Sequence, residues 1–171
     1  MFTSKEHFER ADWPLLQNGA VNLFWRPEIL IEARQALAEL DYEIIEVSCA
    51  TELPGFETLM SHALRWREQF GYAPWTGNLD AFNDAMRNFP FGPSGRSVLV
   101  LTGFHRLVAA DDKRAHALLD IIESAARDHL LECKLLIALV QTDDPRYACD
   151  DIGCRSAHWN GREWLDVNRG L

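Results

Sequence analysis

Apolar residues recur along this chain in two rhythms, one typical of amphipathic helices and the other of buried strands. The strand-like segments are AVNLFW (20–25), YEIIEVSCA (42–50), SVLVLT (97–102) and KLLIALVQ (134–141). The longer helix-like segments cover residues 27–40, 56–70 and 111–131. Because strands alternate with helices, the pattern predicts an α/β domain with a small, mainly parallel sheet of about four strands packed by helices.

Two further segments follow from turn signals. Pro54-Gly55 is expected to break the chain before the helix at 56–70. Near the C-terminus, SAHWNGREWLDV places Asn160-Gly161 between two arms that carry aromatic residues. This dipeptide is typical of a two-residue hairpin loop, so we expect a C-terminal β-hairpin.

The short segment NLDAFNDAMRN, from residue 78 onward, has the spacing of an amphipathic helix. One stripe is apolar, and the edge beside it carries Asp80, Asn83, Asp84 and Arg87. A purely structural interpretation is available, in which Asn78 caps the helix and the acidic edge is a solvated face with an Asp84–Arg87 pair. The other interpretation is that the two aspartates meet a positively charged partner.

Composition narrows the function classes. The 171 residues are 47% hydrophobic and carry a formal net charge of -9. This composition is typical of a globular domain, and its negative charge disfavours nucleic acid and anionic membranes as partners but attracts a cationic protein. The longest apolar run, LLIALV (135–140), is too short to span a bilayer, and MFTSKEHFERADW lacks the features of a secretion signal. We therefore expect a cytoplasmic protein.

The order of residues around the short helix resembles the central motif of the barstar family. The motif is Asn78-Leu79-Asp80-Ala81-Phe82-Asn83-Asp84, preceded by a loop rich in glycine and aromatic residues, and the order of strands and helices from 42 to 141 also agrees. The resemblance implies a barstar-like core at 42–141, a strand–helix extension at 1–41 packed on the same domain, and a C-terminal extension at 142–171 that contains the hairpin.

The same resemblance implies an intracellular, immunity-type inhibitor of a secreted ribonuclease such as barnase. The acidic helix would occupy the basic active site as a phosphate mimic. By position, Asp84 matches the main anchor of the family and Asp80 its neighbour, while Glu123 on the long helix falls near a third acidic contact. The implied partner-binding residues are Trp75, Asp80, Asn83, Asp84, Arg87 and Glu123.

The motif also departs from the family pattern. Trp75-Thr76 replaces the usual Tyr-Gly, with the glycine displaced to Gly77, and Asn83 stands where an aromatic residue is found. These differences leave the target open among barnase-like enzymes, other nuclease toxins and other basic proteins.

Other constellations give weaker signals. Cys149 and Cys154 with His158 suggest zinc, but the spacing is loose and a fourth ligand is not evident, so we expect no metal. His116, between Asp112 and Asp120 at helical spacing, has no accompanying nucleophile, so we expect neither an enzyme nor a cofactor. Cys49 and Cys133 lie in or beside apolar stretches and are expected to be buried.

The alternative function is a small-molecule-binding or catalytic α/β domain with its ligand at the carboxyl ends of the strands. The position of the acidic helix separates the two. It should be exposed in an inhibitor and should line a concave pocket in the alternative.

Overall fold

The structure, a computed structural model, describes residues 9–50, 53–72 and 74–171. The first eight residues of the expected N-terminal extension therefore lie outside the described residues. The elements are α2 (Trp13–Leu16), β1 (Val21–Phe24), α3 (Pro27–Ala38), β2 (Glu43–Ser48), α4 (Leu53–Ala63), α5 (Trp66–Phe70), α6 (Leu79–Arg87), β3 (Arg96–Thr102), α7 (Phe104–Ala110), α8 (Asp112–Leu131), β4 (Leu135–Gln141), β5 (His158–Trp159) and the 3-10 helix η1 (Asp166–Arg169).

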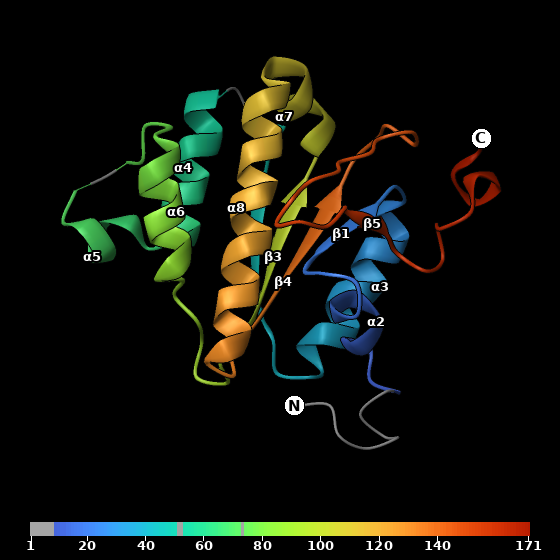
Figure 1. The fold of residues 1–171 in the computed structure, drawn as a ribbon, viewed down its shortest axis with the longest axis horizontal. Coiled ribbons are helices and arrows are strands. Elements are labelled where there is room, and N and C mark those ends of the chain that lie inside the picture. Colours follow the sequence, from blue (N-terminus) through green and yellow to red (C-terminus); the bar gives the residue numbers. More distant parts are fainter. Residues whose placement is uncertain (1–8, 51–52, 73) are drawn as a thin grey trace.

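A parallel sheet forms the centre of the molecule, with its five strands in the order β2-β3-β4-β1-β5 (Figure 1). Strand β3 is apolar at consecutive positions because both of its faces are buried. Leu99 and Leu101 point into one core, whereas Val98 and Val100 point into the other. The predicted α/β class and the four predicted strands are confirmed, and β5 adds a short fifth strand.

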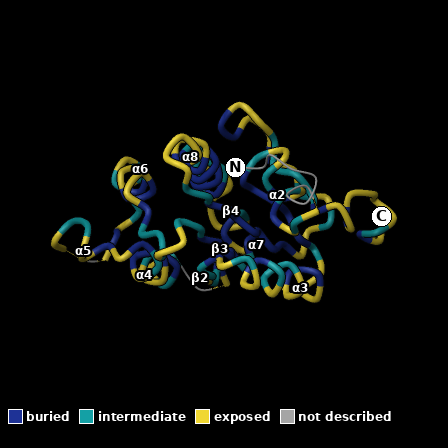
Figure 2. Tube along the Cα trace, turned by 90° about the horizontal axis from the view of Figure 1, so that it is seen from below, coloured by how far each residue is buried: buried dark blue, intermediate teal, exposed yellow. Residues whose placement is uncertain are grey.

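Helices cover both faces of this sheet. Figure 2 shows α8 and α3 on opposite sides of the strands. The larger core lies under α8 and also includes buried residues of α4 and α6. The smaller core is closed by α2 and α3, whose contributions include Leu15, Ile29 and Leu37. The acidic helix therefore belongs to the layer on the α8 side.

Strand β1 belongs to the same sheet as the strands of the segment 42–141. It pairs in parallel with β4, in a register that places Val21 opposite Ala138, and all four of its residues are buried. The chain then crosses the sheet through α3 and enters β2 at the opposite edge. The N-terminal segment thus contributes an internal strand.

The predicted C-terminal hairpin is wrong. His158–Trp159 pairs in parallel with β1, and the residues after Asn160-Gly161 form turns and η1 instead of a second arm. The physical reason is Glu163, which is fully buried and accepts hydrogen bonds from the backbone N–H groups of Trp25 and Arg26 at 3.1 and 2.7 Å. These bonds draw the tail back onto the end of β1.

Two helix boundaries also differ from prediction. The segment 56–70 is divided into α4 and α5 because Arg65 takes a left-handed conformation with φ of 48°. Pro54-Gly55 lies inside the first turn of α4, where proline costs no helical hydrogen bond. Helix α7, which precedes α8, was not predicted.

None of the helices in the described ranges has the length and apolar character that crossing a membrane requires.

Candidate functional site

Helix α6 carries the acidic edge, and its first residue is set by a side-chain cap. Asn78 lies in extended backbone, and its Oδ1 accepts a hydrogen bond from the Ala81 N–H at 3.0 Å. This bond satisfies one of the N–H groups that the first helical turn leaves without a partner. At the other end, the Asn88 side chain donates to the Asp84 carbonyl at 3.0 Å. Both ends of the short helix are therefore defined, and the predicted N-cap is confirmed.

The apolar stripe of α6 faces the core. Phe82 and Met86 are fully buried, and the ring of Phe82 lies 5.2 Å from that of Trp75. Burial of side chains this large is the dominant favourable contribution to docking a short helix. The packing role predicted for Phe82 and Met86 is confirmed.

The opposite edge of α6 faces solvent. Asp80, Asp84 and Arg87 are exposed, and Asn83 is half-buried. Within the described residues, no ion pair or side-chain hydrogen bond involves the Asp80 or Asp84 carboxylate, so the Asp84–Arg87 pair does not form. Two carboxylates about one helical turn apart are thus free to accept hydrogen bonds from outside the chain.

Trp75 lies beneath this edge and not on it. Only 1% of its surface is exposed, its indole Nε1 donates to the Asn78 carbonyl at 2.7 Å, and its backbone N–H donates to Ser61 Oγ at 2.7 Å. The ring also contacts Phe56 and Phe82. In this conformation Trp75 holds the loop before α6 and offers no surface to a partner.

A partly buried ion pair between α8 and α4 lies against the same loop. Arg114 and Glu57 are 2.6 Å apart, and the Arg114 guanidinium also lies over the Trp75 ring at 5.3 Å. Gly77 has φ of 89°, and a Cβ there would clash with the ends of the Arg114 and Glu57 side chains. The backbone conformation therefore favours glycine at 77, and a larger residue would also have to displace this pair. Sequence reasoning missed this pair, because its members are far apart in the chain and form no local pattern.

His129 on α8 fixes the C-terminal half of α6. Its side chain is buried, and Nε2 donates to the Met86 carbonyl at 2.8 Å. The Phe91 ring packs edge-on against the imidazole at 4.8 Å. This contact was not predicted, and together with the Asn78 cap it ties both halves of α6 to fixed partners.

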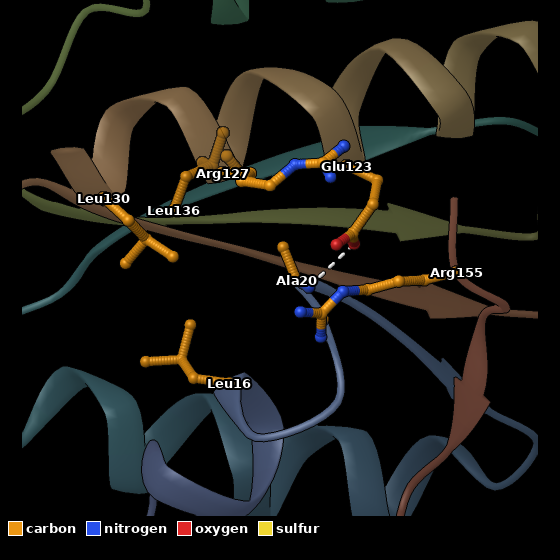
Figure 3. Close-up of a pocket in the computed structure, with 9 residues that line it drawn as sticks. Leu16, Ala20, Glu123, Arg127, Leu130, Leu136 and Arg155 are labelled. Carbon is orange, nitrogen blue, oxygen red and sulfur yellow. Dashed lines mark hydrogen bonds between the residues drawn. The ribbon is translucent and has the colours of Figure 1, made fainter. Parts of the chain in front are cut away.

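Glu123 is also buried, although it was expected at the partner surface. Its Oε2 accepts hydrogen bonds from the backbone N–H groups of Ala20 and Val21 at 2.7 and 3.0 Å. Figure 3 shows the carboxylate pointing toward Ala20, with Arg127 and Arg155 nearby. These residues line a cavity of about 60 Å³ at the amino ends of β1 and β4. The geometry gives Glu123 the role of holding the start of β1.

The comparison with known families decides the identity of this fold. The sequence model described as Barstar (barnase inhibitor) matches residues 48–140, which is more than half of the chain and includes all of α6. The chain belongs to the barstar family. No curated protein and no solved structure gives a significant match. Strand β1, α3, β5 and η1 lie outside the matched region of this barstar-family chain.

The cysteines and histidine considered for metal binding or catalysis have structural positions in the fold. Cys149 is buried and Cys154 is exposed, and the described residues contain no group of three or more His, Cys, Asp or Glu side chains suited to a metal ion. The His116 ring contacts the Asp150 carbonyl at 2.9 Å, while Asp120 accepts a hydrogen bond from the Gly153 N–H. Both side chains thus hold the C-terminal loop against α8.

The carboxyl ends of the strands were the alternative site. There the Gln141 side chain accepts a hydrogen bond from the Gly103 N–H at 2.8 Å and donates one to Asp143 at 2.7 Å. The cavity of Figure 3 lies at the other end of the sheet. Asp80 and Asp84 do not line this cavity and are exposed.

Proposed function

We propose that this barstar-family chain binds a cationic ribonuclease or nuclease toxin domain through α6 and blocks its active site. The observation that carries the proposal is the pair of exposed carboxylates of Asp80 and Asp84, which have no ion-pair partner within the described residues and lie on a helix held by its N-cap, its apolar stripe and His129. The family description, an inhibitor of barnase, supports a protein partner of this kind.

The chemistry follows from what a nuclease active site must contain. Such a site holds phosphate with cationic side chains, and a carboxylate offers the same groups a charge-assisted hydrogen bond. Because the Asn78 cap and the His129 contact already fix the helix, binding does not have to order it. The net charge of -9 adds attraction at long range and raises the association rate.

Other residues of the edge have separate roles. Asn83 lies between the two aspartates in sequence and can donate or accept a hydrogen bond, and the exposed Arg87 can pair with an acidic residue of the partner. Trp75 and Glu123 act from within the fold, the first by supporting the loop before α6 and the second by fixing β1.

The test is inhibition of RNA cleavage by a panel of purified basic ribonucleases and nuclease toxin domains, with barnase included. We expect the wild-type chain to inhibit at least one of them, and Asp84→Asn to weaken that inhibition by at least about tenfold. Glu39→Gln is the matched control, since it removes one exposed charge just after α3, on the other side of the sheet. Equal inhibition by the two variants, or no inhibition of any nuclease in the panel, would contradict the proposal.

A further inference from the structure

A groove of about 420 Å³ lies between α4 and α5, a volume that lies within the range of small-molecule sites. Its lining includes His62, Arg65, Trp66, Arg67 and Glu68, with Pro74 at the start of the loop that leads to α6. Neither Asp80 nor Asp84 lines it, so the groove is distinct from the acidic edge.

The break between the two helices creates this groove. Arg65 has φ of 48°, which a residue other than glycine rarely adopts, and the chain turns sharply there. The Gln69 side chain stabilises the turn by donating to the Leu64 carbonyl at 2.6 Å. As a result, Arg65, Trp66 and Arg67 are brought beside His62 of α4 instead of continuing along one helix.

Trp66 provides a hydrogen-bond donor that the fold does not use. The residue is 1% exposed and packs against Phe70 and Trp75, yet its Nε1 has no acceptor among the described residues. A buried indole N–H normally finds a partner, and leaving it without one is costly. The Nε1 of Trp75, by comparison, donates to the Asn78 carbonyl.

Charge around the groove is locally positive in a chain that is otherwise acidic. Two guanidinium groups and an imidazole line it, against the single carboxylate of Glu68. Arg65 lies 3.7 Å from Glu43, whereas Arg67 forms no ion pair within the described ranges. The lining hydroxyls of Thr58 and Ser61 already donate to backbone carbonyls. The unused donors are therefore concentrated on Trp66, Arg67 and His62.

From this arrangement we infer that the groove between α4 and α5 binds the oxyanion group of a small molecule, either a phosphate or a carboxylate. The exposed Arg67 guanidinium donates to its oxygens, with His62 beside it, while Trp66 forms the covered wall of the groove, where its indole N–H senses an anion bound nearby. A charge-assisted hydrogen bond from arginine supplies most of the attraction. The inference does not depend on the proposed inhibition of a nuclease.

The experiment follows the Trp66 indole N–H resonance by NMR while inorganic phosphate, and in a separate titration acetate, is added at constant ionic strength with sodium chloride. The resonance is assigned from its loss in Trp66→Phe. We expect a saturable shift of this resonance in the wild-type chain. Arg67→Gln should weaken the titration roughly tenfold, because a charge-assisted donor is lost.

Arg106→Gln is the matched control, since Arg106 is an exposed arginine on α7. It should leave the titration unchanged. Saturation by phosphate alone would indicate a phosphorylated ligand, and saturation by both anions a carboxylate-accepting site. Absence of a shift with either anion, or identical titrations of Arg67→Gln and the wild-type chain, would overturn the inference.

Discussion

Glu123 shows how one buried carboxylate can organise a distant part of the chain. Its Oε2 accepts hydrogen bonds from two backbone N–H groups at the start of β1, and a Cβ on Gly19 would lie 2.9 Å from its other oxygen. Glu123→Ala should therefore lower the free energy of unfolding by about 2–4 kcal/mol, because two buried donors lose their acceptor. Urea unfolding would measure this, with the exposed Glu39→Ala as control. A loss as small as that of the control would contradict the assignment.

The two aspartates of α6 should contribute unequally to the affinity for a cationic partner. Asp84→Asn is expected to weaken the proposed nuclease complex more than Asp80→Asn, since Asp84 lies deeper in the helix. Neither change should move the thermal midpoint by more than a few degrees, because neither carboxylate has a partner within the described residues. Association rates measured at low and high salt would show the long-range part of the effect as a rate that falls with salt. Unchanged affinity for both variants would make this edge a solvated face only.

The four cysteines should differ in thiol reactivity according to their burial and thiol pKa. Burial raises the pKa of the Cys49 thiol to about 12, and burial also raises the pKa of Cys149. Cys133 and Cys154 are exposed, so the prediction that Cys133 is buried is wrong; it follows α8 in a left-handed turn with φ of 59°. Since the thiolate is the reactive form, an aromatic disulfide reagent at pH 8 should modify two thiols of the folded chain and four in urea. Rapid modification of all four without denaturant would contradict it.

The sequence was informative about residues whose environment is set by their own helix. The 3.6-residue spacing correctly predicted that Phe82 and Met86 are buried and that Asp80 and Asp84 are exposed. It gave no indication that Trp75 would be buried, because that depends on Ser61 and on the Arg114–Glu57 pair. Burial of this kind is decided by contacts between segments far apart in the chain.

Helix α6 is short enough that its stability comes from docking. An isolated helix of nine residues is marginal in water, so the contacts of Phe82 and Met86 with the core must hold it. Phe82→Ala or Met86→Ala should cost about 2–5 kcal/mol, the usual range for removing a large buried side chain. Denaturant midpoints would test this, with Leu165→Ala as control because Leu165 is 57% exposed. Midpoints that barely change would mean that α6 is not docked as described.

At the scale of elements, the sequence predicted which segments are strands and helices better than how they end. The apolar runs of β3 and β4 were recognisable because both faces are buried. The hairpin prediction was wrong because it relied on Asn160-Gly161, which is a local signal. The path of the tail is instead set by the bond between Glu163 and the Arg26 N–H just after β1, two residues that are 137 positions apart. The break at Arg65 had no signal either, since arginine does not favour a left-handed conformation.

The stability of the whole molecule depends on segments outside residues 48–140, the region that matches the family. Strand β1 pairs with β4, and Glu123 bonds to its first residues. A fragment limited to 42–141 would leave β4 as an unpaired apolar edge and Glu123 without its donors. We expect this fragment to lack cooperative unfolding and to aggregate, as observed by near-ultraviolet circular dichroism and light scattering. A monomeric fragment with the midpoint of the full chain would show that 42–141 is an independent domain.

The place of β1 between β4 and β5 also affects when the protein can fold. Pairings between the first and last parts of a chain slow folding, because a long loop must close before any contact compensates for it. During synthesis, Val21–Phe24 has no sheet to enter until β4 has been made, and Glu163 cannot reach the Arg26 N–H until later still. His129, which fixes α6, also follows that helix by many residues. The native sheet can therefore form only after the chain has been translated as far as Glu163, and until then the apolar side chains of β1 lack the neighbours that bury them.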